Sequence, residues 1–343
     1  MSFTPISLQD GGALTRKIQS WVPADPSILV VSLSEEAAVI RIPEGDHVIT
    51  ASGLMIEGIH ADLTYQSMAH LGFKSVSRGL GSLLAMNGQG EWITLNLALP
   101  RKISLELLED FFSGVRAACR EFRLSVAGVN LSPTSANLVI GYTAGGRVSP
   151  DQLIRKGGCA AGDLIAVTGY PGRSFSGLKV LLREKAIYLS QPEGYSPSFQ
   201  NESWLIESYL TPRPPVSTTS WMSANQLKPT AMAGLTEGLA GGLYQLISAS
   251  GLGADLEENL LPSHEQIRDL ATRLGDDDLQ YVLYGGDDPG LIMTFPPSAA
   301  DRIESCEDLT VIGTITSSHQ HLMLVNPIDG ARPVDPIGGW QNE

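Results

Sequence analysis

A glycine-rich segment between a predicted strand and a predicted helix is the first candidate for chemistry in this sequence. Gly169-Tyr-Pro-Gly172-Arg-Ser-Phe-Ser-Gly177 follows the apolar run Leu164–Thr168. Backbone N–H groups in such a turn, together with the positive end of a helix, can hold an anion. Arg173 and Ser174 would add a cation and a hydroxyl donor. The segment matches neither GxGxxG nor the Walker pattern, so a tight structural turn is the alternative interpretation.

Two acidic pairs could serve a metal ion. Glu35-Glu36 and Asp287-Asp288 would offer the carboxylate oxygens that Mg²⁺ prefers. An exposed acidic turn is the commoner meaning of such a pair. His319 and His321 share one face of a predicted strand, but no third ligand follows nearby, so a zinc site is disfavoured.

Length, charge and cysteine content exclude several classes of protein. A chain of 343 residues is longer than one compact core usually holds, so two domains are expected. The 37 acidic residues outnumber the 23 basic ones, which gives a net charge of −14. This balance argues against binding to nucleic acid or to an anionic membrane surface, both of which require clustered basic residues. Three dispersed cysteines predict free thiols, and no apolar run reaches the roughly 20 residues that span a bilayer. With no signal-peptide pattern at the start, a cytoplasmic location is predicted.

The elements that must position these groups can be read from hydrophobic periodicity. Leu105–Phe122 is the clearest helix, because apolar residues recur every three or four positions after the N-cap candidate Ser104. Gly145-Gly146 and Pro150 indicate a boundary between a first domain, residues 1–148, and a second, residues 149–343. Further predicted elements are a helix over Tyr65–Met86, strands over Ile28–Leu33, Ala37–Ile42, Val48–Ala51, Trp92–Leu99, Asn137–Thr143, Leu291–Phe295 and Leu309–Ile315, a helix from Leu178, a loop over 189–204 and a long helix over Ala231–Ser250.

Taken in order, short motifs from about residue 31 to 316 resemble the thiamine-monophosphate kinase family of the aminoimidazole ribonucleotide synthetase superfamily. Each motif is short, but their order and spacing make the resemblance specific. They are Ile56-Glu57-Gly58-Ile59-His60, Gly72-Phe73-Lys74, Gly162-Asp163-Leu164-Ile165-Ala166-Val167-Thr168-Gly169, Ser174-Phe-Ser-Gly177-Leu178 and Gly285-Gly286-Asp287-Asp288.

The resemblance implies a fold, a reaction and a set of site residues. The expected fold has an N-terminal α/β domain, whose mixed sheets from two subunits pair into a β-barrel in a homodimer, and a C-terminal α+β domain. The implied reaction is ATP-dependent phosphorylation of thiamine monophosphate to thiamine diphosphate, with Mg²⁺ held by aspartates. Carried onto this chain, nucleotide or phosphate binding falls to Lys74, Gly169, Gly172, Arg173 and Ser174, and metal binding to Glu35, Glu36, Glu237, Asp287 and Asp288.

The sequence departs from the family pattern mainly at the carboxylates. Gly53, Ser82, Val129 and Gly234 stand where the family motifs carry aspartate, and Arg173 replaces an aspartate in the glycine-rich turn. Glutamates replace aspartates at Glu35, Glu36 and Glu237, and the late Glu-Asp-Tyr-Glu motif reads Asp287-Asp288-Pro289-Gly290. Octahedral Mg²⁺ tolerates little displacement of its ligands, so these changes predict weakened metal binding.

Three hypotheses follow from the sequence. The first is a homologue without kinase activity that keeps the dimeric scaffold and binds a small phosphorylated or nucleotide-like ligand without Mg²⁺. The second is an ATP-using enzyme with a changed substrate and a rebuilt metal site. The third is a working thiamine-monophosphate kinase. Near the C-terminus, Trp340 would stack on a ligand ring or anchor the tail.

Overall fold

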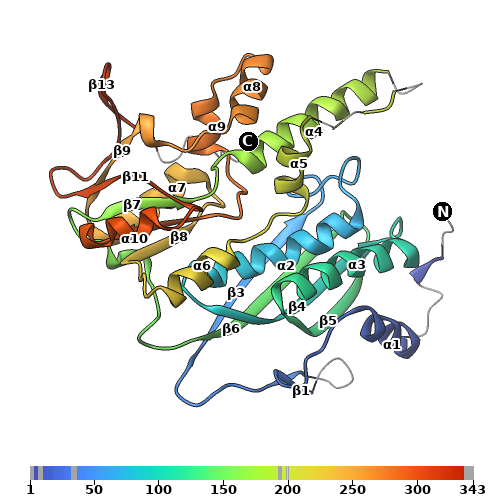
Figure 1. Cartoon of the computed structure of the whole chain (residues 1–343). Helices are drawn as coiled ribbons and strands as arrows, with labels where there is room; N and C mark the ends of the chain where they lie inside the picture. Colours follow the sequence, from blue (N-terminus) through green and yellow to red (C-terminus); the bar gives the residue numbers. More distant parts are fainter. Residues whose placement is uncertain are drawn as a thin grey trace. The chain divides into compact units, whose positions relative to one another are not determined.

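The computed structural model describes residues 4–6, 11–31, 37–191, 195–197, 199 and 201–335. Glu35, Glu36 and Trp340 therefore lie outside the described residues. The chain divides into two compact units (Figure 1), the first made of Met1–Leu84 and Gly88–Asp151, and the second of Ala85–Asn87 and Gln152–Glu343. The last residue of unit 1 lies three residues beyond residue 148, where the sequence predicts the first domain to end.

Unit 1 is built on a four-stranded mixed sheet with the order β3-β6-β4-β5. Its strands are β3 (His47–Ile56), β4 (Gln89–Pro100), β5 (Ser125–Thr134) and β6 (Val139–Val148). Strands β4 and β5 run parallel, and the other neighbours are antiparallel. The sheet is open, and the described strands of this unit form no closed barrel. The predicted mixed sheet is thus present.

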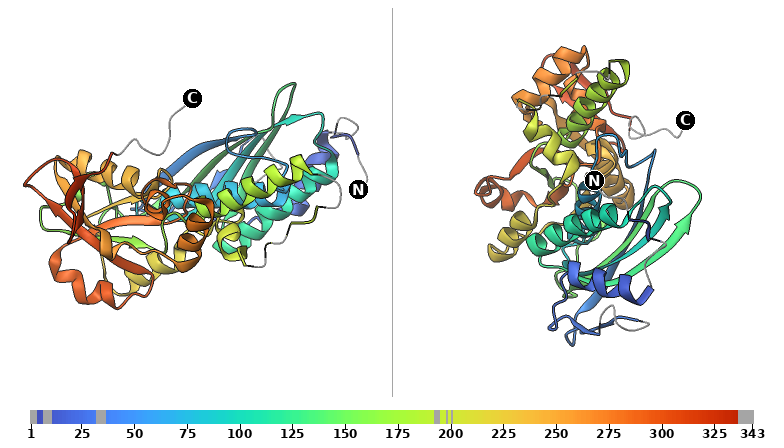
Figure 2. Two further views of the ribbon diagram at one scale, coloured as in Figure 1. Left: turned by 90° about the horizontal axis from the view of Figure 1, so that it is seen from above. Right: turned by 90° about the vertical axis from the view of Figure 1, so that its right-hand side faces the viewer.

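Two helices, α2 (Met68–Leu84) and α3 (Leu105–Phe122), pack together on one face of this sheet (Figure 2). The predicted bounds of α3 are confirmed. The Ser104 hydroxyl accepts the N–H of Leu107 at its N-terminus, and Arg123 ends it in the left-handed conformation. Side chains on the opposite face of the sheet are less covered, and Leu54 in β3 is 57% exposed. A short helix, α1 (Gly11–Trp21), and the antiparallel pair β1 (Leu29–Val31) and β2 (Val39–Ile40) complete the unit.

Unit 2 has a seven-stranded sheet with the order β13-β12-β9-β11-β7-β10-β8. All neighbouring strands are antiparallel except β9 and β12. The strands are β7 (Leu164–Thr168), β8 (Ala231–Gly234), β9 (Gly253–Glu257), β10 (Leu291–Phe295), β11 (Leu309–Thr316), β12 (Leu322–Asn326) and β13 (Gly330–Pro333). Together with the helices this gives the α+β architecture expected of the second domain.

Among the described residues of unit 2, seven α-helices join these strands: α4 (Arg173–Ser190), α5 (Ser203–Leu210), α6 (Val216–Ala224), α7 (Gly238–Ser250), α8 (Glu265–Leu274), α9 (Asp278–Tyr284) and α10 (Ala300–Glu304). The apolar side of α7, including Leu239 and Leu243, packs with buried strand residues such as Ile292 in one continuous core. No helix in the described part of the chain is long and apolar enough to cross a bilayer.

Several predicted elements are wrong in their bounds. The strand predicted over Val48–Ala51 spans His47–Ile56, and the strand predicted over Asn137–Thr143 spans Val139–Val148. The helix predicted over Tyr65–Met86 spans Met68–Leu84. The helix predicted over Ala231–Ser250 begins only at Gly238, because residues 231–234 pair with β10 as strand β8. Alanine has the highest intrinsic helix propensity, but such propensities are small, and pairing within the sheet overrides them here. The helix predicted from Leu178 begins five residues earlier, at Arg173, and the predicted loop over 189–204 holds the first two residues of α5.

Candidate functional site

The glycine-rich turn connects β7 to α4 and requires glycine at two positions. Gly169 and Gly172 have φ angles of +60° and +86°, which other residues rarely adopt. A Cβ atom on Gly172 would also lie 2.5 Å from the carbonyl oxygen of Tyr281. The first turn of α4 is therefore held close to the end of α9, next to the segment Gly285–Asp288.

The carboxylate of Asp288 occupies the N-terminus of α4. It accepts the backbone N–H of Gly172 at 2.7 Å and that of Ser174 at 2.8 Å, and the residue is only 6% exposed. The buried hydroxyl of Ser174 donates to the carbonyl of Ser208 at 3.4 Å. This corrects the prediction that Gly172 and Ser174 offer their amide groups to a phosphate. The turn does bind an anion, but that anion is the side-chain carboxylate of Asp288 in the same chain.

Burial raises the pKa of Asp288 to about 7, although the two N–H donors and the nearby Arg173 oppose this shift. The negative charge of Asp287 raises it further. Each oxygen of Asp288 accepts one amide group, and its role as a metal ligand stays a prediction. The carboxylate serves as an internal helix cap that gains or loses its proton near neutral pH.

The other predicted metal ligands of unit 2 lie on neighbouring loops. The N–H of Asp287 donates to the carbonyl of Thr236 at 2.8 Å, which joins the segment 285–288 to the loop before α7. Glu237 accepts a hydrogen bond from the Gln245 side chain at 2.7 Å. Within the described ranges, no three His, Cys, Asp or Glu side chains are grouped to hold a metal ion.

Arg173 is a half-buried cation bonded to a neutral group. Its Nε and Nη2 donate to the carbonyl of Trp204 at 3.0 and 2.7 Å, and its guanidinium carbon lies 4.0 Å from the centre of the Trp204 ring. Burial lowers the pKa of Arg173, while the charges of Glu207 and Asp288 raise it. In the part of the chain that the structure describes, no carboxylate pairs with Arg173 in a salt bridge.

An aromatic cluster continues from this arginine. The rings of Trp204 and His264 lie 4.1 Å apart with a tilt of 31°, and the Tyr170 ring contacts both of them edge-on. The N-termini of α4, α5 and α8 are joined by these contacts, because His264 is also the N-cap of α8. The stack fixes the Arg173 guanidinium in place through its cation–π contact with Trp204.

A cavity of about 430 Å³ opens beside this cluster, within unit 2. Its polar lining residues include Tyr170, Arg173, Ser208, Arg213, Asp288 and Asp308, and proline side chains form part of its apolar wall. This volume lies in the range typical of small-molecule sites. Sequence reasoning found Arg173 and Asp288 but missed Tyr170, Ser208, Arg213 and Asp308. The only sequence signal near Arg213 is the pair of prolines on either side of it, Pro212 and Pro214, which indicate a break between elements.

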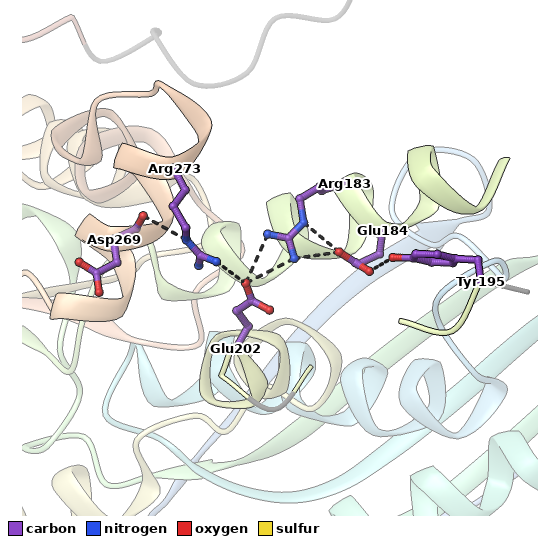
Figure 3. Close-up of polar contacts among 6 residues, drawn as sticks. All are labelled: Arg183, Glu184, Tyr195, Glu202, Asp269 and Arg273. Carbon is purple, nitrogen blue, oxygen red and sulfur yellow. Dashed lines mark hydrogen bonds and ion pairs between the residues drawn. The ribbon is translucent and has the colours of Figure 1, made fainter. Parts of the chain in front are cut away.

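An ion network anchors α5 to its neighbours (Figure 3). Glu202, just before α5, accepts Arg183 of α4 at 3.3 Å and Arg273 of α8 at 3.0 Å, and its side chain is 7% exposed. Arg183 also pairs with Glu184, which in turn accepts the hydroxyl of Tyr195. Because Trp204 and Ser208 lie on α5, this network helps to fix one wall of the cavity.

In unit 1, the position expected to carry a family aspartate is covered by a tyrosine. Gly53 of β3 and Tyr142 of β6 are direct cross-strand partners. A Cβ atom on Gly53 would lie 2.5 Å from Cζ of Tyr142. An aspartate at position 53 would thus meet the tyrosine ring. Lys74, predicted to bind a nucleotide or phosphate, is fully buried within α2.

Comparisons with known proteins agree with this architecture. The family model "AIR synthase related protein, N-terminal domain" matches residues 34–148. The thiamine-monophosphate kinase of Synechococcus elongatus is 29% identical over 307 residues, covering 87% of this chain and 86% of that protein.

Solved structures show the same fold along nearly the whole chain. The thiamine-monophosphate kinase of Stenotrophomonas maltophilia is 23% identical, with a TM-score of 0.78 over 92% of this chain and 94% of that one. AaThiL complexed with AMPPCP and TMP has a TM-score of 0.72 at 23% identity, over 87% and 90% of the two chains. The first unit therefore contains an AIR synthase related N-terminal domain. Over most of its length, the chain is similar to thiamine-monophosphate kinases in sequence and in fold.

Proposed function

We propose that this chain binds a phosphorylated small molecule in the scaffold of a thiamine-monophosphate kinase, and that its magnesium-dependent phosphoryl transfer from ATP is weak or lost. The observation that carries this proposal is the Tyr142 ring over Gly53. A missing aspartate would leave an open space that water or a neighbouring ligand could fill. Here the Tyr142 side chain fills that space, so the sheet is closely packed at the position where the carboxylate is missing.

The chemistry of phosphoryl transfer explains why this position matters. The protein contributes mainly by placing metal ions that bridge phosphate oxygens and neutralise their charge. Gly53, Ser82 and Val129 offer no carboxylate at three positions where the family resemblance expects one. Asp288, one of the acidic residues that remain, is bonded to the backbone of α4. The supply of metal ligands is therefore smaller than the acidic composition suggests.

A working kinase is the second candidate, and the comparisons favour it. The likeness to the Synechococcus elongatus kinase extends over 86% of that protein, and AaThiL binds AMPPCP and TMP in the same fold. In this case ATP and Mg²⁺ would be the cofactors, and the metal ligands would have to come from Glu35, Glu36, Glu237, Asp287 and Asp288. An ATP-dependent enzyme with this rebuilt metal site and another phosphate acceptor is the related alternative.

Formation of thiamine diphosphate from thiamine monophosphate, ATP and Mg²⁺ separates these candidates. We expect turnover about 100-fold or more below that of the Synechococcus elongatus kinase assayed in parallel, because several metal ligands are missing together. Turnover within about tenfold of that enzyme would establish the working kinase instead. ATP consumption that requires a different phosphate acceptor would establish the changed-substrate enzyme.

We further propose that the chain forms a homodimer through the less covered face of the unit 1 sheet. Leu54 is the most exposed apolar side chain of β3 and lies on the face opposite to α2. Wild-type protein should have the mass of a dimer in size-exclusion chromatography with light scattering, and Leu54→Lys should shift it toward the monomer. Ile328→Lys, at an exposed turn of unit 2, is the matched control and should leave the mass unchanged. A monomeric wild type would refute the dimer.

A further inference from the structure

We propose that the start of helix α2 is a pH-sensitive cap, in which the His70 ring holds the backbone of Ser67 only while the ring is neutral, so that mild acid opens the first turn of α2 and the connection before it. This connection, residues 57–67, joins β3 to α2 within unit 1. Because the cap lies in unit 1, it is independent of the cavity of unit 2 and of the proposed function.

Ser67 and His70 bond to each other's backbone at the N-terminus of α2. The Ser67 hydroxyl accepts the N–H of His70 at 3.2 Å, and Nδ1 of His70 accepts the N–H of Ser67 at 3.3 Å. This is the reciprocal arrangement of a capping box, in which a glutamate or glutamine usually stands at the position of His70. Those side chains accept a hydrogen bond at neutral pH and in mild acid alike. A histidine accepts one only while Nδ1 carries no proton.

The capped turn is also fixed to α3, which lies beside α2 (Figure 1). The carboxylate of Asp110 accepts the N–H of Ala69 at 2.9 Å. Two glycines bring the backbones of the helices into contact: a Cβ atom on Gly72 would lie 2.0 Å from the carbonyl oxygen of Phe111, and one on Gly114 would lie 1.9 Å from that of Ala69. The first turn of α2 has no room to shift as a helix, so loss of its cap is relieved by unwinding.

Protonation of His70 opposes this cap in two ways. The new N–H group on Nδ1 would face the N–H of Ser67, and the positive charge would lie at the positive end of the helix dipole. Burial lowers the pKa of His70, although the charge of Asp110 opposes this shift. The closed cap therefore favours the neutral ring. As pH falls through the range in which an exposed histidine titrates, the opened form binds the proton more readily and gains stability relative to the closed form.

The carboxylates of this region are engaged by other groups. Asp62, Glu57 and Glu106 each accept a backbone N–H group. The charge that acts on His70 comes from Asp110 of α3. Exposed carboxylates stay ionised in mild acid. A change of charge at the start of α2 between neutral pH and mild acid is therefore a change at a histidine.

A second histidine lies at the other end of the same connection. Nδ1 of His60 accepts the N–H of Ile56 at 3.3 Å, where β3 ends. Its protonation would loosen the end of β3, whereas protonation of His70 would loosen the start of α2. The two effects fall on different amide groups and can be separated by replacing each histidine alone.

The connection also contains a polar group that opening would satisfy. Gln66 is 2% exposed, and its Oε1 accepts the N–H of Asp62 at 2.9 Å. In the part of the chain that the structure describes, its Nε2 has no hydrogen-bond partner. A buried donor without a partner costs free energy, which hydration in the opened form would recover. This group lowers the cost of opening the connection.

Hydrogen exchange of peptides that span residues 62–72, measured by mass spectrometry, tests the cap. We expect their protection, corrected for the intrinsic effect of pH, to fall about fivefold or more between about pH 7.5 and about pH 5, the effect of one lost hydrogen bond. The start of α3, which Ser104 caps without a histidine, is the internal reference and should keep its protection. A local readout is needed because Asp288 of unit 2 titrates in the same window and changes global stability in the opposite direction.

His70→Gln keeps an acceptor for the N–H of Ser67 but cannot titrate, so protection at residues 62–72 should no longer depend on pH. His70→Ala should show the low protection already at neutral pH. His47→Gln, the same substitution at an exposed histidine of β3, is the matched control and should keep the wild-type fall, as should His60→Gln.

Constant protection of residues 62–72 relative to α3 in the wild type would overturn the proposal. It would be overturned equally if His70→Gln lost protection in acid as the wild type does, or if the fall disappeared in His60→Gln and persisted in His70→Gln. Thermal melts at neutral pH establish that each variant is folded.

Discussion

Replacing Asp288 with asparagine should remove most of the decrease in stability that the protein undergoes between about pH 4 and pH 7. Burial raises the pKa of this carboxyl group from 3.8 to about 7 in the folded protein. The folded state then binds a proton that the unfolded state has already released, so the free energy of unfolding falls as pH rises through this window. A shift of this size corresponds to at most ~4 kcal/mol.

The amide side chain introduced by Asp288→Asn cannot titrate, so this contribution should vanish in the variant. Asparagine can accept only one of the two N–H groups of Gly172 and Ser174 with its oxygen, which should cost about 1–3 kcal/mol at the acidic end of the range. At the neutral end, the variant should approach or exceed the stability of the wild type. The measurement is urea unfolding followed by circular dichroism at a series of pH values.

Other groups contribute to the pH profile, so the difference between variant and wild type is the quantity to read. Burial lowers the pKa of His70, which makes stability rise with pH through the range where an unfolded histidine titrates. Asp301→Asn, at an exposed position of α10, is the control and should keep the wild-type profile. If Asp288→Asn kept that profile as well, Asp288 would be ionised throughout, and the N–H groups of Gly172 and Ser174 would outweigh the effect of burial.

Local patterns in the sequence were enough to predict the elements that lie in the core. Leu105–Phe122 has apolar residues at helical spacing and a serine at its N-cap, and both features act within a few residues. Leu164–Thr168 and Leu291–Phe295 are apolar runs of strand length, and both lie inside the sheet of unit 2. In contrast, β8 is a short run of alanine, methionine and glycine whose strand conformation depends on pairing with β10.

The candidate site could be predicted only in part, because residues far apart in the sequence form it. The glycine-rich turn was recognisable because its residues are consecutive, and glycine at positions 169 and 172 is needed for positive φ angles. Its partner Asp288 is more than a hundred residues away, so its use of the two amide groups is a property of the fold. Ser208 and Tyr142 carry no sequence signal at all, because their importance lies in what surrounds them.

The Gly53→Asp substitution, which supplies the aspartate of the family motif, should destabilise the protein without creating a magnesium site. The new side chain would collide with the Tyr142 ring, whose Cζ lies 2.5 Å from the position of the added Cβ atom. Overpacking of this kind costs about 1–3 kcal/mol. Tyr142→Leu removes the outer part of the ring and keeps an apolar side chain. In that background the cost of Gly53→Asp should fall by at least ~1 kcal/mol, a coupling that urea unfolding of all four proteins would measure.

Ser52→Asp is the control for this cycle, because its side chain lies on the opposite face of β3 and bonds to Thr143. Its cost should be the same in the wild type and in the Tyr142→Leu background. Calorimetry with Mg-ATP provides the functional readout. Neither Gly53→Asp nor its combination with Tyr142→Leu should gain magnesium-dependent ATP binding, since Ser82 and Val129 still lack carboxylates. If Gly53→Asp alone raised magnesium-dependent binding and turnover, one residue would separate this chain from an active kinase, and the proposal of a scaffold packed around lost metal ligands would fail.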